Sequence, residues 1–225
     1  MQQPVTGSAK CTLYMTIKAK EVTQVLLNHI WGLFTMPQQE WQLIRSESSS
    51  VSKVYLTHVL LLAAIPAICG YIGFTQVGWS VGNDKLVKLT ESNAAGMALL
   101  SYCAMLAGIF VMGCFIQWMA KTYNASTSLS QTIVFAAYTA TPLFFTGLGA
   151  LLPNVWLNML LAIAGASYAT YLLYTGIPVM MQVPKEVGFL FASSVLCVGL
   201  VVLVSIITIT VLVWGIGIGP SQVVF

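Results

Sequence analysis

Acidic and basic side chains are scarce in this chain of 225 residues, and none lies inside its five longest apolar runs. Charged residues make up 7% of the sequence, against roughly 25% in a soluble domain. Each run has the roughly 20 residues that a helix needs to cross a bilayer core. The sequence therefore predicts an all-α polytopic membrane protein, a bundle of five transmembrane helices at about residues 54–74, 94–119, 132–152, 155–174 and 189–216.

The missing intramembrane charge also limits the chemistry that the spans can perform. Proton relays in membranes normally use acidic residues or histidines, and the only two histidines are His29 and His58. We expect a water or backbone partner for His58 near the inner surface, with proton coupling as the alternative. The sequence contains no HExxH motif, P-loop or nucleophile elbow, so it predicts no catalytic residue, no enzyme and no cofactor.

Sulfur-bearing side chains are the remaining candidates for a metal site. Met105, Met112 and Met119 recur every seven residues, and Cys103 and Cys114 are eleven apart. Such soft ligands could pass Cu(I) along a helix. However, neither a histidine nor a carboxylate joins them, and methionine is also a common packing residue. We therefore predict no metal site and keep transport of a soft metal as an alternative only.

Three segments divide the chain. Residues 1–28 are predicted to form a disordered or loosely attached tail, residues 29–53 a cytoplasmic amphipathic segment with a serine-rich hinge, and residues 54–225 the five-span domain.

The amphipathic segment is predicted to be an interfacial helix. Thr35 followed by Gln38 fits a capping box. Trp31, Phe34 and Trp41 are aromatic residues of the kind that anchor proteins in the headgroup zone. The alternative is a helix packed on the inner rim of the bundle.

The distribution of basic residues predicts the orientation in the membrane. With a cytoplasmic N-terminus, seven basic residues lie inside and two outside, which the positive-inside rule favours. The inner set is Lys10, Lys18, Lys20, Arg45, Lys53, Lys121 and Lys185, and the outer set is Lys85 and Lys88. The C-terminus is then periplasmic. The basic residues form no patch with interleaved aromatics, so no nucleic-acid partner is predicted.

The third span contains the candidate substrate or kink region, Tyr138, Thr139, Thr141 and Pro142. Proline in a membrane helix frees a backbone carbonyl, which neighbouring hydroxyls or helices must satisfy. Broken helices of this kind line the binding sites of transporters, and they are also ordinary kinks in packed bundles.

The fourth span carries a candidate helix-packing face. Ala162 and Ala166 are four residues apart, as are Gly165 and Ala169. Small residues at this spacing let helices approach closely. We predict packing through this face, within the chain or between copies of it.

Four stretches together resemble the Yip family of five-span membrane proteins, in its bacterial inner-membrane branch. They are residues 29–37, HIWGLFTMP, residues 58–66, HVLLLAAIP, residues 138–143, YTATPL, and residues 171–178, YLLYTGIP. The similarity runs from about residue 29 to the last span. It implies a multi-pass protein of the bacterial inner membrane and assigns no catalytic residues. Eukaryotic members associate with Rab GTPases through a longer, acidic N-terminal region; the region here is short and basic, so a Rab-type partner is not expected.

Two functions remain open from the sequence. The first is a non-enzymatic membrane organiser or interaction scaffold, whose partners are the lipid bilayer and further copies of the chain or other membrane proteins. The alternative is a transporter or channel for a small neutral or lipid-like substrate. A transporter should have a solvated cavity near Tyr138, Thr141 and Pro142, whereas a scaffold should have a closed interior with any groove open to lipid or to another protomer.

Overall fold

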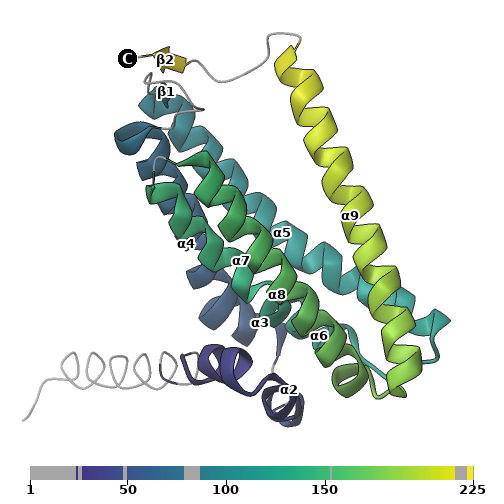
Figure 1. The fold of residues 1–225 in the computed structure, drawn as a ribbon. Helices are drawn as coiled ribbons and strands as arrows, with labels where there is room; N and C mark the ends of the chain where they lie inside the picture. The colour runs from purple at the N-terminus through teal and green to yellow at the C-terminus, as the bar shows by residue number, and fades with distance from the viewer. Residues whose placement is uncertain are drawn as a thin grey trace, which may run out of the picture.

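The computed structural model describes residue 24 and residues 27–47, 50–78, 87–152, 154–215 and 222–224. Five apolar helical spans run alongside one another, which confirms the all-α class and the five predicted spans (Figure 1). They are Val51–Val77, Glu91–Thr122, Leu129–Leu151, Val155–Met181 and Lys185–Val204. Almost all of the predicted tail, residues 1–28, lies outside the described residues.

The first span is helical throughout but alternates between α and π winding, with three changes along its length. Its segments are α3 (Val51–Val54), the π-helical η1 (Tyr55–Val59), α4 (Leu60–Ile72) and the π-helical η2 (Gly73–Val77). The Ser50 hydroxyl begins the span by accepting a hydrogen bond from the Lys53 amide. Single π turns inside α-helices are rare and often occur at functional sites, so η1 is a candidate functional position.

The third span is broken where Pro142 predicted a break. The Ser128 hydroxyl and the Gln131 side chain form a capping box that starts α6 (Leu129–Thr139). The helix stops at Thr139, and α7 (Thr141–Thr146) starts one residue later with Pro142 in its first turn. A 3₁₀ segment, η3 (Gly147–Leu151), completes the span. Proline has no amide hydrogen and its ring clashes with the preceding turn, which accounts for the interruption.

The remaining spans are long single helices. They are α5 (Glu91–Thr122), α8 (Val155–Met181), which Asn154 caps by accepting from the Leu157 amide, and α9 (Lys185–Gly215). At the far end of the bundle from α2, β1 (Val87–Leu89) pairs antiparallel with β2 (Gln222–Val224). This short pairing was not predicted, because it joins segments far apart in the sequence.

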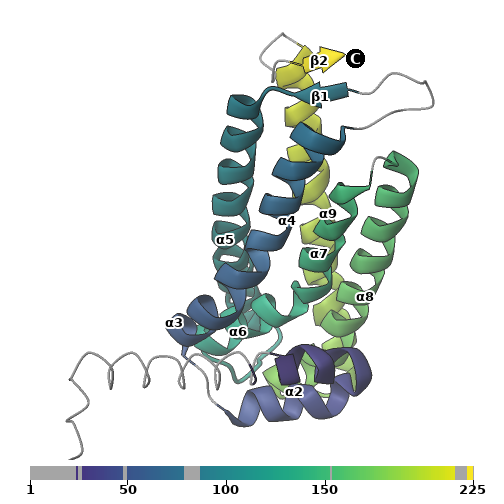
Figure 2. The ribbon, with the colours of Figure 1, turned by 90° about the vertical axis from the view of Figure 1, so that its left-hand side faces the viewer.

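The segment ahead of the first span forms two helices and not one. Residues 27–35 are helical, the chain turns at Met36, and α2 (Pro37–Ser46) follows. The predicted capping box was wrong: Met36 precedes α2 without a side-chain cap, and the Thr35 hydroxyl donates to the Trp31 carbonyl. Figure 2 shows the two helices lying across one end of the bundle. We call these two helices, residues 27–47, the helix pair.

The helix pair packs tightly on the spans. Trp41 is fully buried, and its ring lies 5.0 Å from the Phe135 ring of α6. Both rings rest on Gly176 of α8, where a Cβ atom would collide with them. The Tyr168 hydroxyl of α8 donates to the Leu33 carbonyl. The alternative that we considered for this segment, packing on the rim of the bundle, therefore describes it better than free insertion into the headgroup zone.

Candidate functional site

His58 lies in the irregular turn of the first span. It belongs to η1 and is 1% exposed. Its Nε2 lies 3.0 Å from the Thr141 hydroxyl, across the break in the third span. The sequence-based expectation of a water or backbone partner for His58 did not include this side-chain partner. The π turn of one span and the break in another meet at this hydrogen bond.

Tyr138 lies between the two histidines of the chain. The centroid of its ring is 4.4 Å from that of His58 and 5.6 Å from that of His29. Only 6% of Tyr138 is exposed. Aromatic contacts at these separations favour tilted or edge-to-face geometries, which both pairs adopt. Tyr138 thereby connects the interior of the bundle to the helix pair.

His29 is held between two carboxylates of the helix pair. Its Nδ1 lies 2.5 Å from Glu40 Oε1, and its Nε2 lies 3.2 Å from Glu47 Oε1. His29 and Glu40 are both buried. Gly32 makes room for Glu40, because a Cβ atom there would overlap the carboxylate. Only the contact between Nδ1 and Glu40 has hydrogen-bond geometry.

We call these six residues the histidine–tyrosine cluster: His29, Glu40, Glu47, His58, Tyr138 and Thr141. It contains both histidines of the chain and reaches from the helix pair into the third span. The sequence reading missed His29, Glu40 and Glu47 as partners. The one available signal was the Met36-Pro37 step, which ends the first helix and allows the chain to turn back.

The candidate kink residues occupy two environments. Tyr138, Thr141 and Pro142 are buried, while Thr139, the last residue of α6, is half-buried and borders the α9 groove described below. The transporter hypothesis requires a cavity bordered by the three buried residues. The grooves described below are bordered by none of them.

The small residues of α8 separate into two pairs. Gly165 and Ala169 are buried, and a Cβ atom at Gly165 would meet the Thr146 side chain and the Pro142 carbonyl. This pair packs within the chain. Ala162 and Ala166 are exposed, and each borders a groove.

The predicted aromatic anchors also differ from one another. Trp31 is 71% exposed and Phe34 42%, so both side chains are available to a membrane surface. Phe34 also stacks on Tyr168, with ring centroids 5.1 Å apart. Trp41 is fully buried. Its contacts are with the protein. The spacing of apolar residues along a helix predicts an apolar face but does not show whether protein or lipid covers it.

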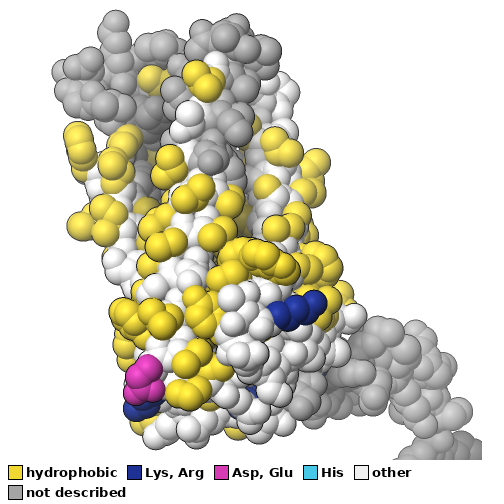
Figure 3. All heavy atoms as spheres, turned by 90° about the vertical axis from the view of Figure 1, so that its right-hand side faces the viewer, with side chains coloured by type: hydrophobic (Ala, Val, Ile, Leu, Met, Phe, Trp, Pro, Cys, Tyr) yellow, Lys and Arg dark blue, Asp and Glu magenta, His cyan; other side chains and the backbone are white. Residues whose placement is uncertain are grey.

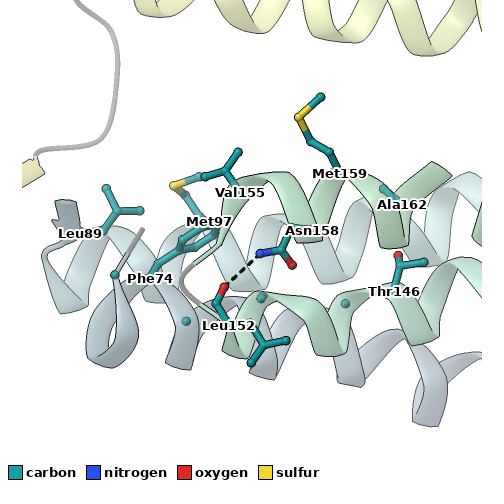
Figure 4. A pocket seen from close by; sticks show the side chains of 13 residues that line it. Phe74, Leu89, Met97, Thr146, Leu152, Val155, Asn158, Met159 and Ala162 are labelled. Carbon is teal, nitrogen blue, oxygen red and sulfur yellow. Dashed lines mark hydrogen bonds between the residues drawn. The ribbon is translucent and has the colours of Figure 1, made fainter. Parts of the chain in front are cut away.

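Several apolar grooves open on the described part of the bundle, and two of them border the small residues of α8. One, of about 580 Å³, lies near the β1 end between η2, α5, η3 and α8 (Figure 4). Its central polar side chain, Asn158, donates to the Leu152 and Asn154 carbonyls. The other, of about 420 Å³, lies between α9 and helices α5 to α8; we call it the α9 groove.

Metal binding finds no support in the described part of the chain. No group of three or more His, Cys, Asp or Glu side chains there could hold a metal ion. Cys103 is exposed and Cys114 is half-buried.

These features define an integral membrane protein with five helical spans and a buried polar cluster at the break in the third span. The sequence profile of the Yip1 domain matches residues 31–206, and the chain belongs to this family. It is 47% identical over 191 residues to "Inner membrane protein YohC" of Escherichia coli K12, and equally to the protein of that name from the O6:H1 strain CFT073. Each alignment covers 85% of this chain and 98% of the relative. No solved structure matches the chain.

Replacing Thr141 with valine tests the central hydrogen bond. Thr141→Val leaves the buried His58 Nε2 without its partner, and we expect the free energy of unfolding in detergent to fall by about 1–3 kcal/mol. The matched control is Thr208→Val, because Thr208 is exposed and bonds only its own helix. In a His58→Phe background the Thr141 substitution should cost less. Equal losses for Thr141→Val and Thr208→Val would contradict the assigned role.

Replacing His29 with phenylalanine tests the attachment of the helix pair. His29→Phe keeps a ring beside Tyr138 but leaves the buried Glu40 carboxylate without its hydrogen-bond partner, which is costly for a buried group. We expect faster trypsin cleavage after Arg45, whose Nη1 is held 2.7 Å from the Val179 carbonyl in the intact fold. Gln38→Ala, on the exposed face of α2, is the control. Unchanged cleavage in the His29 variant would disprove the attachment.

Proposed function

We propose that this protein is a non-enzymatic organiser of the bacterial inner membrane, which acts through lateral contacts with further copies of itself or with other membrane proteins. The observation that carries the proposal is the closed state of the predicted substrate region. Thr141 is fully buried and bonded to His58, and the Tyr138 ring fills the space between the two histidines. No groove described here is bordered by Tyr138, Thr141 or Pro142, and of the four candidate residues only Thr139 borders one, the apolar α9 groove.

The exposed surface of the spans also supports a lateral role. The described part of α9 beyond residue 199 has consecutive exposed apolar side chains, from Leu200 to Val204. Figure 3 looks onto this side of the molecule, where hydrophobic side chains extend over most of the height and charged ones lie only in the lower part. Helices with little cover from their own chain are suited to contacts in the plane of the membrane.

A carrier of a small neutral or lipid-like molecule is the second candidate. It is favoured by the pairing of a π turn with a broken helix, since irregular membrane helices recur at transporter binding sites. It would require His58 and Thr141 to separate, because their hydrogen bond closes the region in this structure.

The name of the relatives supports a location in the inner membrane. For the orientation, we propose a cytoplasmic helix pair and a periplasmic C-terminus. The described basic residues Arg45, Lys53, Lys121 and Lys185 belong to the helix pair or to the span ends near it, while Lys88 lies in β1 at the other end. This asymmetry agrees with the positive-inside rule.

Association is best tested by native mass spectrometry of the protein in native nanodiscs. We expect a homo-oligomer or a reproducible co-purifying subunit. Crosslinking between copies through the exposed Cys197 of α9, with Cys197→Ser as control, gives a second readout in intact membranes. A monomer without any co-purifying subunit in both experiments would refute the organiser proposal and leave the carrier.

Orientation is tested with two C-terminal fusions. We expect alkaline phosphatase fused after Phe225 to be active and green fluorescent protein at the same position to be dark, because each folds productively on only one side of the inner membrane. The same reporters fused within the 123–128 connection should give the reverse pattern. Fluorescence of the C-terminal fusion would overturn the orientation.

A further inference from the structure

In the described part of α9, the hydrogen bonds that attach it to the other spans lie near its beginning. The Tyr123 hydroxyl lies 2.6 Å from that of Ser194, and the Tyr174 hydroxyl lies 2.8 Å from that of Ser193. Beyond these bonds α9 diverges from the other helices (Figure 1). The groove begins there, bordered by Val195 and Leu203 on α9 and by Gly108 and Ile116 on α5.

The walls of the groove are apolar and lie within the spans. Its polar side chains are Thr139 and Thr170, and the Thr170 hydroxyl already donates to the Ala166 carbonyl. Ordered water needs two to four polar partners, which these walls do not supply. An empty space of about 420 Å³ would deprive its lining of dispersion contacts. The groove therefore favours an apolar ligand over water.

The size of the groove distinguishes a lipid chain from a helix. The stretches Gly108–Ile116 and Val195–Leu203 that border it each advance by about 12 Å at 1.5 Å per residue. A volume of about 420 Å³ over that length gives a mean cross-section of roughly 35 Å². A helix at least 10 Å in diameter needs about 80 Å². The groove is too narrow to enclose a helix, and it is wide enough to hold a hydrocarbon chain.

We propose that the α9 groove binds one acyl chain of a membrane phospholipid. The proposal goes beyond the organiser function and does not require it, because the chain sits between helices of a single protomer. A bound acyl chain completes the packing between α9 and α5 that the side chains leave open. It makes the position of α9, and with it the exposed lateral surface, responsive to the surrounding lipid.

Two glycines allow the groove to be filled without disturbing the protein. A Cβ atom at Gly108 would meet nothing within 4 Å, and one at Gly199 would meet only the Met112 methyl at 3.9 Å. Leucine at either position therefore extends into open space and also favours the helix over glycine. Gly96, likewise on α5, has nothing within 4 Å and does not border the groove. Gly96→Leu is the matched control.

The test uses the full chain in nanodiscs that contain phosphatidylethanolamine with a diazirine on one acyl chain. After irradiation, peptide mapping should place label on the groove faces of α5 and α9. We expect severalfold less label there in Gly108→Leu and in Gly199→Leu, with the wild-type level in Gly96→Leu. Circular dichroism and gel filtration establish that each variant is folded, and the two variants lie on separate helices, so each tests the site independently.

Two results would overturn the proposal. The first is equal labelling of the groove in all four proteins, or label spread evenly over every exposed helix face. The second is the absence of label in the groove of the wild-type protein, together with a change in the co-purifying proteins when Gly108→Leu or Gly199→Leu fills the groove. That result would identify a protein segment as the occupant. Labelling is measured within one protomer, so a monomer with no co-purifying subunit but a labelled groove would refute the organiser function and leave this inference intact.

Discussion

The hydrogen bond between His58 and Thr141 joins the two irregular points of the membrane core. In a bilayer, backbone groups freed by an irregular helix have no water to bind and depend on protein partners. The π turn of the first span and the proline break of the third would each be costly if they faced lipid. Because they face one another, their polar groups are enclosed. Tyr138 then extends this contact to His29, so the helix pair is joined to the same point.

This connection changes how the segment before the first span is understood. It is outside the membrane runs, yet its Trp41 is buried against Phe135 and its His29 contacts the third span. The Yip1 profile also begins at residue 31, inside the first helix of the pair. The helix pair is therefore part of the folded domain and not an appended tail. A structural change in the helix pair would alter the contacts of Tyr138 and so reach the break in the third span.

The sequence predicted the features that depend on local chemistry. The five spans follow from the length of apolar runs, and the break follows from the proline at position 142. The partners of His29 could not be read in the same way, because Glu40 and Glu47 reach it only after the chain reverses at Met36. For the same reason Thr35 was misread as a cap. Burial of Trp41 and the shape of the α9 groove depend on how whole helices are placed, which periodicity within one helix does not fix.

The small residues of α8 explain why the interior is closed while the sides are open. Gly165 lies three residues after Ala162, so at 100° per residue the two pairs point about 60° apart. Gly165 meets α7 and lets the spans approach closely, while Ala162, Ala166 and Ala169 border the grooves. A single pattern of small residues thus produces tight packing on one face of the helix and recesses on the next. His58, Tyr138 and Thr141 are buried, whereas the grooves along the sides of the spans are open. Lipids are the first molecules that these lateral surfaces meet.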